Sequence, residues 1–354
     1  MSRASKAKKI ATAAAYGGGG VGAVGALGGA ALIGVMFGES RIARHRIPIA
    51  VEDPPISHDT IWAAAGVSRS RPPIRIVMLG DSTAAGYGVH RDRDTPAAQL
   101  AIGISDAARR PVHVTNVAVV GAESHELAAQ VDALRGRRGI ELAVIMIGAN
   151  DVTERTRPAV PVRFLADAVT ALRVLGADVV VGTCPDLGTI RPLPQPLRWY
   201  ARRLSRRLAA AQTVAVVQAG GRTVSLGDLL GPLFATHREF FADDQFHPSA
   251  AGYAEATRAI LPSCLDALGL RTRATSASPF TTRRAKPVAK AAVQAASRPG
   301  SEVAAVERAG SSTRRGRFAH LRRRRQPLTV ASPESATSSE PEPTADRRHR
   351  PPAR

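Results

Sequence analysis

The amino-acid sequence predicts an α/β protein built on one mainly parallel sheet with helices on both faces. Short apolar runs alternate with longer segments of helical composition through residues 74–270. The runs are predominantly apolar, and Leu142–Ile147 is apolar throughout, which is typical of parallel strands buried on both faces. Repeated strand–helix–strand units form right-handed crossovers, and a series of them gives a doubly wound sheet.

Five runs have the length and β-branched content of strands, the last of them more weakly than the others: Ile74–Leu79, Val112–Val120, Leu142–Ile147, Ala177–Gly182 and Thr223–Leu226. Five segments between or after them have helical composition: 96–109, 123–135, 160–175, 197–218 and 249–268. Pro248 and Ser249, which are residue types that begin helices, mark the start of the last segment. Residues 74–270 suffice for one sizeable core, so we expect one folded domain there.

The first 38 residues have the pattern of an export signal or a membrane anchor. A few basic side chains precede a stretch from Ile10 to Gly38 that contains no charge, and a stretch of that length can cross a bilayer. A soluble glycine-rich leader is the alternative. An export signal or a membrane anchor would each predict an exported or membrane-anchored protein of the cell envelope or the extracellular space. Residues 39–73 contain five prolines and are expected to form a linker.

The net charge of +20 lies mostly at the C-terminal end: residues 74–270 carry a net +2 and residues 271–354 a net +13. Charge alone therefore does not make the predicted domain a nucleic-acid binder. Residues 271–354 have little apolar periodicity and few aromatic side chains, which predicts a disordered basic tail. Because base stacking needs aromatic side chains, we expect no nucleic-acid partner. Instead, leader and tail would contact a membrane or an anionic envelope polymer, unless the tail has no specific partner.

The two cysteines, Cys184 and Cys264, exclude a disulfide-rich scaffold. They leave two alternatives open, a single disulfide in an exported domain or two buried free thiols. No spacing of histidines and cysteines matches a metal site, so we expect neither a metal nor a cofactor.

Polar residues gather where the predicted strands end, which is where parallel sheets bind ligands. Ser82 follows the first strand, Gly121 the second and Asn150 the third, while Asp244 and His247 precede the last helix. A serine, two sources of N–H groups, a carboxylate and an imidazole would thus meet at one edge of the sheet. These are the groups that acyl transfer requires: a nucleophile, oxyanion donors, a base and a group that orients the base.

The spacing fits this chemistry. A serine hydroxyl is a poor nucleophile unless a base accepts its proton, and His247 can do so if Asp244 holds its ring in the right tautomer. Asp244 and His247 are three residues apart, so a single turn before the last helix can position both. Taken singly, each block has an ordinary explanation, such as a helix cap at Asp81 or a solvated turn. The four blocks together, in this order, are specific.

These four blocks resemble those of the SGNH (or GDSL) hydrolase family over about residues 74–270, and the leader and tail resemble those of exported mycobacterial or related actinobacterial members. The resemblance implies a three-layer, flavodoxin-like fold and the hydrolysis of esters, thioesters or acylated sugars without a metal. It also implies the following roles: Ser82 as nucleophile, Asp244 and His247 as the rest of the triad, and Ser82, Gly121 and Asn150 as oxyanion donors. Thr83 stands where the family has leucine, a departure that bears on substrate preference and not on chemistry.

We therefore expect a monomeric serine esterase or lipase that hydrolyses short- to medium-chain acyl esters through an acyl-enzyme. The alternatives are a carbohydrate O-deacetylase acting on acylated envelope glycans and a non-catalytic envelope-binding protein. The proline-rich, apolar segment Pro185–Tyr200, which includes Leu193, follows the fourth strand and would overhang the active edge. It is expected either to wall the acyl pocket or to pack as an apolar loop on the next helix.

Overall fold

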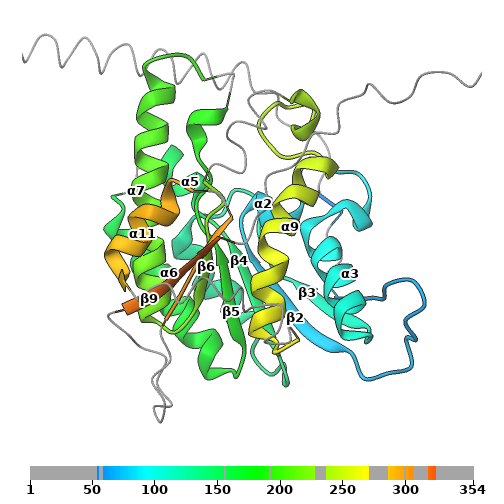
Figure 1. Ribbon diagram of the computed structural model, residues 1–354. Coiled ribbons are helices and arrows are strands. Elements are labelled where there is room, and N and C mark those ends of the chain that lie inside the picture. The colour runs from blue at the N-terminus through cyan, green and yellow to red at the C-terminus, as the bar shows by residue number, and fades with distance from the viewer. Residues whose placement is uncertain are drawn as a thin grey trace, which may run out of the picture.

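The computed structural model describes residues 54–55, 59–154, 157–190, 193–227, 237–270, 286–298, 300–305 and 318–323. They form one sheet with the strand order β1-β3-β2-β4-β5-β6-β8-β9-β7 (Figure 1). Its strands are β1 Asp59–Trp62, β2 Ile74–Gly80, β3 Val112–Asn116, β4 Leu142–Met146, β5 Asp178–Gly182, β6 Arg222–Val224, β7 Lys286–Pro287, β8 Ser301–Ala305 and β9 Phe318–Arg323.

The predicted α/β fold is confirmed, and its five expected strands are the parallel centre of the sheet. The strands β3, β2, β4, β5 and β6 lie side by side and pair in parallel. All five begin within one residue of the expected position, but the second ends at Asn116 instead of Val120. The sheet as a whole is longer than predicted, because four further strands extend its two edges.

The helices cover both faces of this sheet. Within the described residues, those longer than five residues are α3 Pro96–Ala108, α4 Leu127–Asp132, α6 Ala159–Val174, α7 Leu197–Gln218, α9 Ala250–Ala267 and α11 Val288–Ala296. Among them, α3 and α9 pack beside each other on one face (Figure 1). On the opposite face α6 packs between α4 and α7.

Successive side chains of β2 point into two different cores. Ile76 and Met78 pack in the core beneath α3 and α9, whereas Val77 and Leu79 pack in the core beneath α4 and α6. Neighbouring residues of a strand point to opposite faces of the sheet. Burial on both faces therefore explains why this run shows no alternation of polar and apolar residues.

The prediction that residues 39–73 form a linker is wrong for residues 59–62, which form a strand of the sheet. The strand β1 pairs antiparallel with β3, from Asp59 opposite Thr115 to Trp62 opposite Val112. The carboxylate of Asp59 accepts hydrogen bonds from Arg137 and Thr115, which fasten the start of the strand. The partly exposed side chains of β1 are typical of an edge strand. A strand of only four residues has too short a pattern to be distinguished from linker sequence.

The prediction of disorder throughout residues 271–354 is wrong for residues 286–298, 300–305 and 318–323. The strand β8 pairs antiparallel with β6, and β9 pairs with β8. The helix α11 packs against α7, and its buried face consists mainly of alanine, together with Val288. Alanine adds little to an apolar pattern, although it packs well against a neighbouring helix. A prediction from composition alone therefore misses a buried helix that is rich in alanine.

Both cysteines are buried free thiols, so the disulfide alternative is wrong. Cys184 follows β5 and lies within 3.4 Å of the carbonyl oxygen of Gly148, while Cys264 is part of the core beneath α3 and α9. Burial raises the pKa of both thiols, which makes them poor nucleophiles. The predicted export signal or anchor, residues 1–38, lies outside the described residues. In the part of the chain that the structure describes, no helix is long and apolar enough to span a bilayer.

The C-terminal extension of the sheet leads to a prediction about stability. A chain that ends at Leu270 should have an unfolding temperature at least about 5 °C below that of a chain that ends at Arg323. The reason is that removal of α11, β8 and β9 exposes Val217 on α7 and leaves the edge of β6 unpaired. Thermal unfolding followed by circular dichroism measures the difference. As a control, a chain that ends at Arg323 should match the full-length chain. Equal unfolding temperatures for the two shortened chains would contradict the prediction.

Candidate active site

A sharp turn at the end of β2 presents Ser82. Gly80 has φ +135°, and a Cβ built on it would lie 1.9 Å from the carbonyl oxygen of Met146 on β4, so only glycine fits. The N–H of Asp81 then donates to that same carbonyl at 3.1 Å. Ser82 begins the short helix α2, Ser82–Ala85, for which Asp81 is the N-cap. The carboxyl end of β2 therefore fixes the position of Ser82 directly.

Two buried glutamines hold the ends of the central strands. The side chain of Gln130, on α4, accepts from the N–H of Gly80 at 2.8 Å and donates to its carbonyl at 2.9 Å. The side chain of Gln212, on α7, accepts from Cys184 N–H at 2.8 Å and donates to the carbonyl of Ile147 at 3.1 Å. Each amide thus supplies hydrogen-bond partners for buried backbone groups at the point where a strand leaves the sheet.

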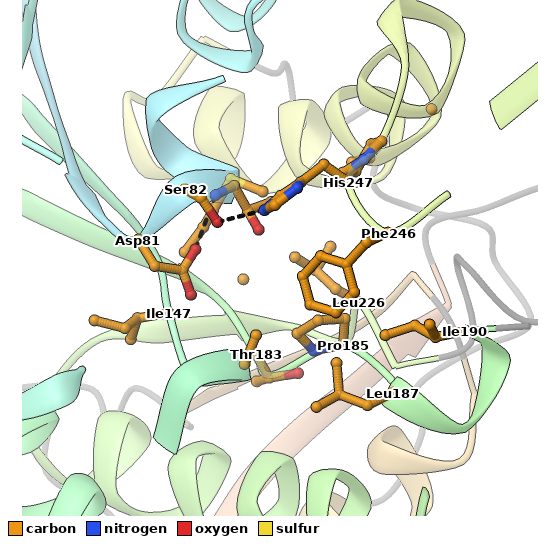
Figure 2. Close-up of a pocket in the computed structure, with 17 residues that line it drawn as sticks. Asp81, Ser82, Ile147, Thr183, Pro185, Leu187, Ile190, Leu226, Phe246 and His247 are labelled. Atoms are coloured by element: carbon orange, nitrogen blue, oxygen red, sulfur yellow. Dashed lines mark hydrogen bonds between the residues drawn. The ribbon is translucent and has the colours of Figure 1, made fainter. Parts of the chain in front are cut away.

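The structure brings Ser82, His247 and Asp244 into one hydrogen-bonded chain. The Nε2 atom of His247 lies 3.0 Å from the Ser82 hydroxyl oxygen (Figure 2). Its Nδ1 atom lies 2.6 Å from Oδ2 of Asp244. If Nδ1 carries the ring hydrogen and donates it in a hydrogen bond to the carboxylate, Nε2 is left free to take the proton of the serine.

The loop before α9 holds the carboxylate and the imidazole in place. Burial raises the pKa of Asp244, but the hydrogen bonds from the His247 ring and from the N–H groups of Phe246 and His247 outweigh this effect and bring the pKa below its usual range. The carboxylate therefore stays ionised. The rings of Tyr87 and Phe246 contact the His247 ring edge to face, with centroids 4.5 and 4.8 Å away.

The predicted oxyanion donors lie on the loops after β3 and β4. Gly121 has φ +83° and is exposed, with no atom within 4 Å of a Cβ built on it. The side-chain amide of Asn150 donates to the carbonyl of Ala122 at 2.9 Å, which ties the two loops together and leaves its second N–H available. Among the described residues, no hydrogen bond joins either Gly121 or Asn150 to Ser82. Their role in an oxyanion site stays a prediction.

Sequence reasoning misses Asp151, the neighbour of Asn150. Its buried carboxylate accepts from the N–H of Ser124 at 3.1 Å and from the hydroxyl of Ser124 at 2.7 Å, which adds a second tie between the same two loops. Burial, against the opposing effect of these bonds, raises its pKa. A carboxylate after Asn150 reads as an ordinary turn residue, because its partner lies 27 positions earlier in the chain.

A mostly apolar pocket opens beside Ser82 and His247 (Figure 2). It encloses about 700 Å³, including the part open to solvent. Its apolar wall consists of Met146, Ile147, Pro185, Leu187, Ile190, Leu226 and Phe246, together with small residues. Two buried polar residues, Asp81 and Thr183, also line it. In the described part of the chain, no three metal-binding side chains gather.

The hypothesis that residues 185–200 wall the pocket is confirmed for the first part of that segment. Pro185, Leu187 and Ile190 line the pocket. Leu193 does not line it and packs instead in the apolar cluster between this segment and α7. The short helix η3, Leu187–Thr189, rests on α7 through Asp186, whose carboxylate accepts from both Arg202 and Arg206.

Asp81 is a buried carboxylate at the base of the site. It is 2% exposed and accepts from the N–H of Thr83 at 2.9 Å. Burial raises its pKa to about 6, although bonds from Thr83 and Gly148 and the nearby His247 act in the opposite direction. At neutral pH the folded protein therefore holds a negative charge here against a desolvation penalty.

Comparison with known proteins identifies relatives of this chain. A model of the GDSL-like lipase/acylhydrolase family matches residues 78–255. The GDSL-like esterase Rv1075c of Mycobacterium tuberculosis is 40% identical over 242 residues, which cover 66% of this chain and 77% of that protein. Among solved structures, TesA is 23% identical with a TM-score of 0.42, over 56% of this chain and 99% of that one. A variant of an acetyl xylan esterase from Geobacillus stearothermophilus is 16% identical with a TM-score of 0.43, over 60% and 98%.

The raised pKa of Asp81 predicts a pH-dependent effect of replacing it with asparagine. Between about pH 4 and pH 6 the unfolded wild type ionises at Asp81 before the folded protein does, so this residue lowers the stability of the folded state as the pH rises. The shift of about two units corresponds to about 3 kcal/mol at most. Asp81→Asn should therefore gain stability relative to wild type over this pH window and keep the gain up to pH 8. Urea unfolding of both proteins at several pH values measures the gain, and a stability difference that does not change with pH would contradict the prediction.

Proposed function

Because the chain belongs to the family of GDSL-like lipases and acylhydrolases, we propose that it is a serine esterase that hydrolyses short- to medium-chain acyl esters through an acyl-enzyme. That it is a carboxylic ester hydrolase follows from the family. The nucleophile, the triad and the substrate range are the proposal. The observation that carries it is the chain of hydrogen bonds from Asp244 through His247 to Ser82, which ends at the mouth of an apolar pocket.

In the first half of the proposed reaction, the Ser82 oxygen attacks the ester carbonyl carbon while His247 Nε2 takes the hydroxyl proton. The tetrahedral intermediate then collapses. The bond to the alcohol oxygen breaks, and His247 returns the proton to the departing alcohol. Asp244 stabilises the imidazolium that exists between these two events, because its carboxylate lies 2.6 Å from Nδ1.

In the second half, water attacks the acyl carbon while His247 takes its proton. The bond between the acyl carbon and the Ser82 oxygen then breaks, His247 returns the proton to that oxygen, and the carboxylic acid leaves. Both tetrahedral intermediates carry a negative oxygen that needs hydrogen-bond donors. The N–H groups of Ser82 and Gly121 and the amide of Asn150 are the donors proposed here. The ties from Asn150 to Ala122 and from Asp151 to Ser124 support this assignment, because they hold the two donor loops together.

The lining of the pocket favours an alkyl chain over an acetylated sugar. A sugar would place several hydroxyl groups against side chains such as Leu187, Ile190 and Leu226, which offer them no hydrogen bonds. An alkyl chain would instead remove apolar surface from water on both sides of the contact. The pocket therefore supports the acyl-ester substrate more than it supports the O-deacetylase alternative.

The test is hydrolysis of a series of p-nitrophenyl esters, from acetate to palmitate, by wild type and by Ser82→Ala. We expect a preference for short to medium chains, and a loss of about 10⁴-fold or more in kcat for Ser82→Ala. The matched control is Ser70→Ala, which changes an exposed serine remote from the pocket and should leave kcat unchanged. Equal activity of Ser82→Ala and wild type would contradict the proposed nucleophile, and inactivity of both proteins would exclude simple acyl esters.

The same series assigns the acyl pocket. Ile190→Trp adds bulk to the pocket wall, so the preferred chain should become shorter, with the loss confined to the longer esters. Leu193→Ala, which alters the same segment away from the pocket, should keep the wild-type order of preference. An unchanged order in Ile190→Trp would remove this wall from the acyl site.

A further inference from the structure

The first three turns of α7 carry an unusual concentration of positive charge. Between Leu197 and Leu208 this helix has five arginines and no acidic residue. Figure 1 shows these turns reaching past the ends of the central strands, on the side of the molecule where the strands open to the active site. Residues 74–270 as a whole carry almost no net charge. The positive charge at this end of α7 is therefore a local feature of the domain surface.

The arginines divide between two faces of the helix. Arg202 and Arg206 bind the buried carboxylate of Asp186, which fastens α7 to the pocket wall. Trp199, Arg203 and Arg207 are spaced four residues apart, so they form a stripe along another face. All three are exposed, and the Trp199 side chain is 56% exposed. No carboxylate of the described residues forms an ion pair with Arg203 or Arg207.

The stripe has the chemistry of an interfacial anchor. The guanidinium of Arg203 lies over the Trp199 ring, 5.6 Å from its centroid, so the large apolar ring and the charge are held together. Tryptophan is enriched where protein meets the boundary between lipid and water, because its ring is apolar and its N–H is polar. Arginines beside it attract anionic headgroups. Exposed apolar area next to unpaired positive charge therefore complements an anionic lipid surface.

We propose that this stripe, Trp199, Arg203 and Arg207, docks the folded domain on a membrane that contains anionic lipid. Trp199 would enter the headgroup region while the two arginines contact lipid phosphates. Because Asp186 ties the same helix to Leu187 of the pocket wall, docking would hold the pocket near the lipid surface. Only this last consequence rests on the proposed acyl-ester function; the docking itself does not.

Intrinsic fluorescence tests the docking in the full-length chain. The sequence has two tryptophans, so Trp62→Phe leaves Trp199 as the single reporter. We expect a blue shift on adding phosphatidylglycerol vesicles, quenching by lipids brominated on the acyl chain, and neither effect with phosphatidylcholine vesicles. The converse variant, Trp199→Phe, reports from Trp62 and should show neither effect. Absence of both effects in the Trp199 reporter, or equal effects with the two lipids, would overturn the proposal.

Charge variants in the Trp62→Phe background test the role of the arginines. Each arginine near an anionic surface contributes about fivefold to partitioning, so Arg203→Gln with Arg207→Gln should weaken vesicle binding by about thirtyfold. The matched control, Arg69→Gln with Arg138→Gln, removes two exposed arginines that lie ahead of β2 and β4, at the ends of these strands that are remote from the active site. Those should change binding less than about twofold. Equal losses in the two double variants, or a blue shift with RNA in place of vesicles, would overturn lipid docking by this stripe.

Discussion

The geometry of the site depends on how the central strands are held where they leave the sheet. At that point a strand loses its neighbours, and its buried N–H and C=O groups need new partners. Gln130 supplies both for Gly80, and Gln212 joins Cys184 to Ile147 in the same way. With the strand ends fixed, the close approach of Gly80 to Met146 sets the turn on which Ser82 stands.

The site is built from two sides that meet at Ser82. On one side, the loop before α9 brings His247 and Asp244, and its backbone N–H groups keep Asp244 ionised. On the other side lies a mostly apolar pocket, whose lining includes the buried polar residues Asp81 and Thr183. Burial at the base of this pocket raises the pKa of Asp81 to about 6. Stability is thus lower at neutral pH than an uncharged residue would allow, which is common where a fold supports a reactive site.

The centre of the fold and the main candidate residues are predictable from the sequence, because their signals are local. Predominantly apolar runs reveal β2 and β4, and Asp244 and His247 lie three residues apart. What the sequence does not reveal depends on distant partners. Gln130 lies 50 positions from Gly80 and Gln212 lies 65 positions from Ile147, so neither amide stands out in a pattern. The extensions of the sheet are missed for a related reason, since β1 is too short and α11 too rich in alanine for an apolar pattern to separate them from their surroundings.

The central claim is that Ser82 is the nucleophile and that His247 and Asp244 activate it. Covalent labelling with an alkyl fluorophosphonate, followed by mass spectrometry of the peptides, tests this most directly, because the reagent forms a stable adduct only with an activated serine. The account predicts a single adduct on the peptide that contains Ser82, and a rate of labelling that falls by orders of magnitude in His247→Ala with the protein still folded. An adduct on another serine, or unchanged labelling in His247→Ala, would contradict it.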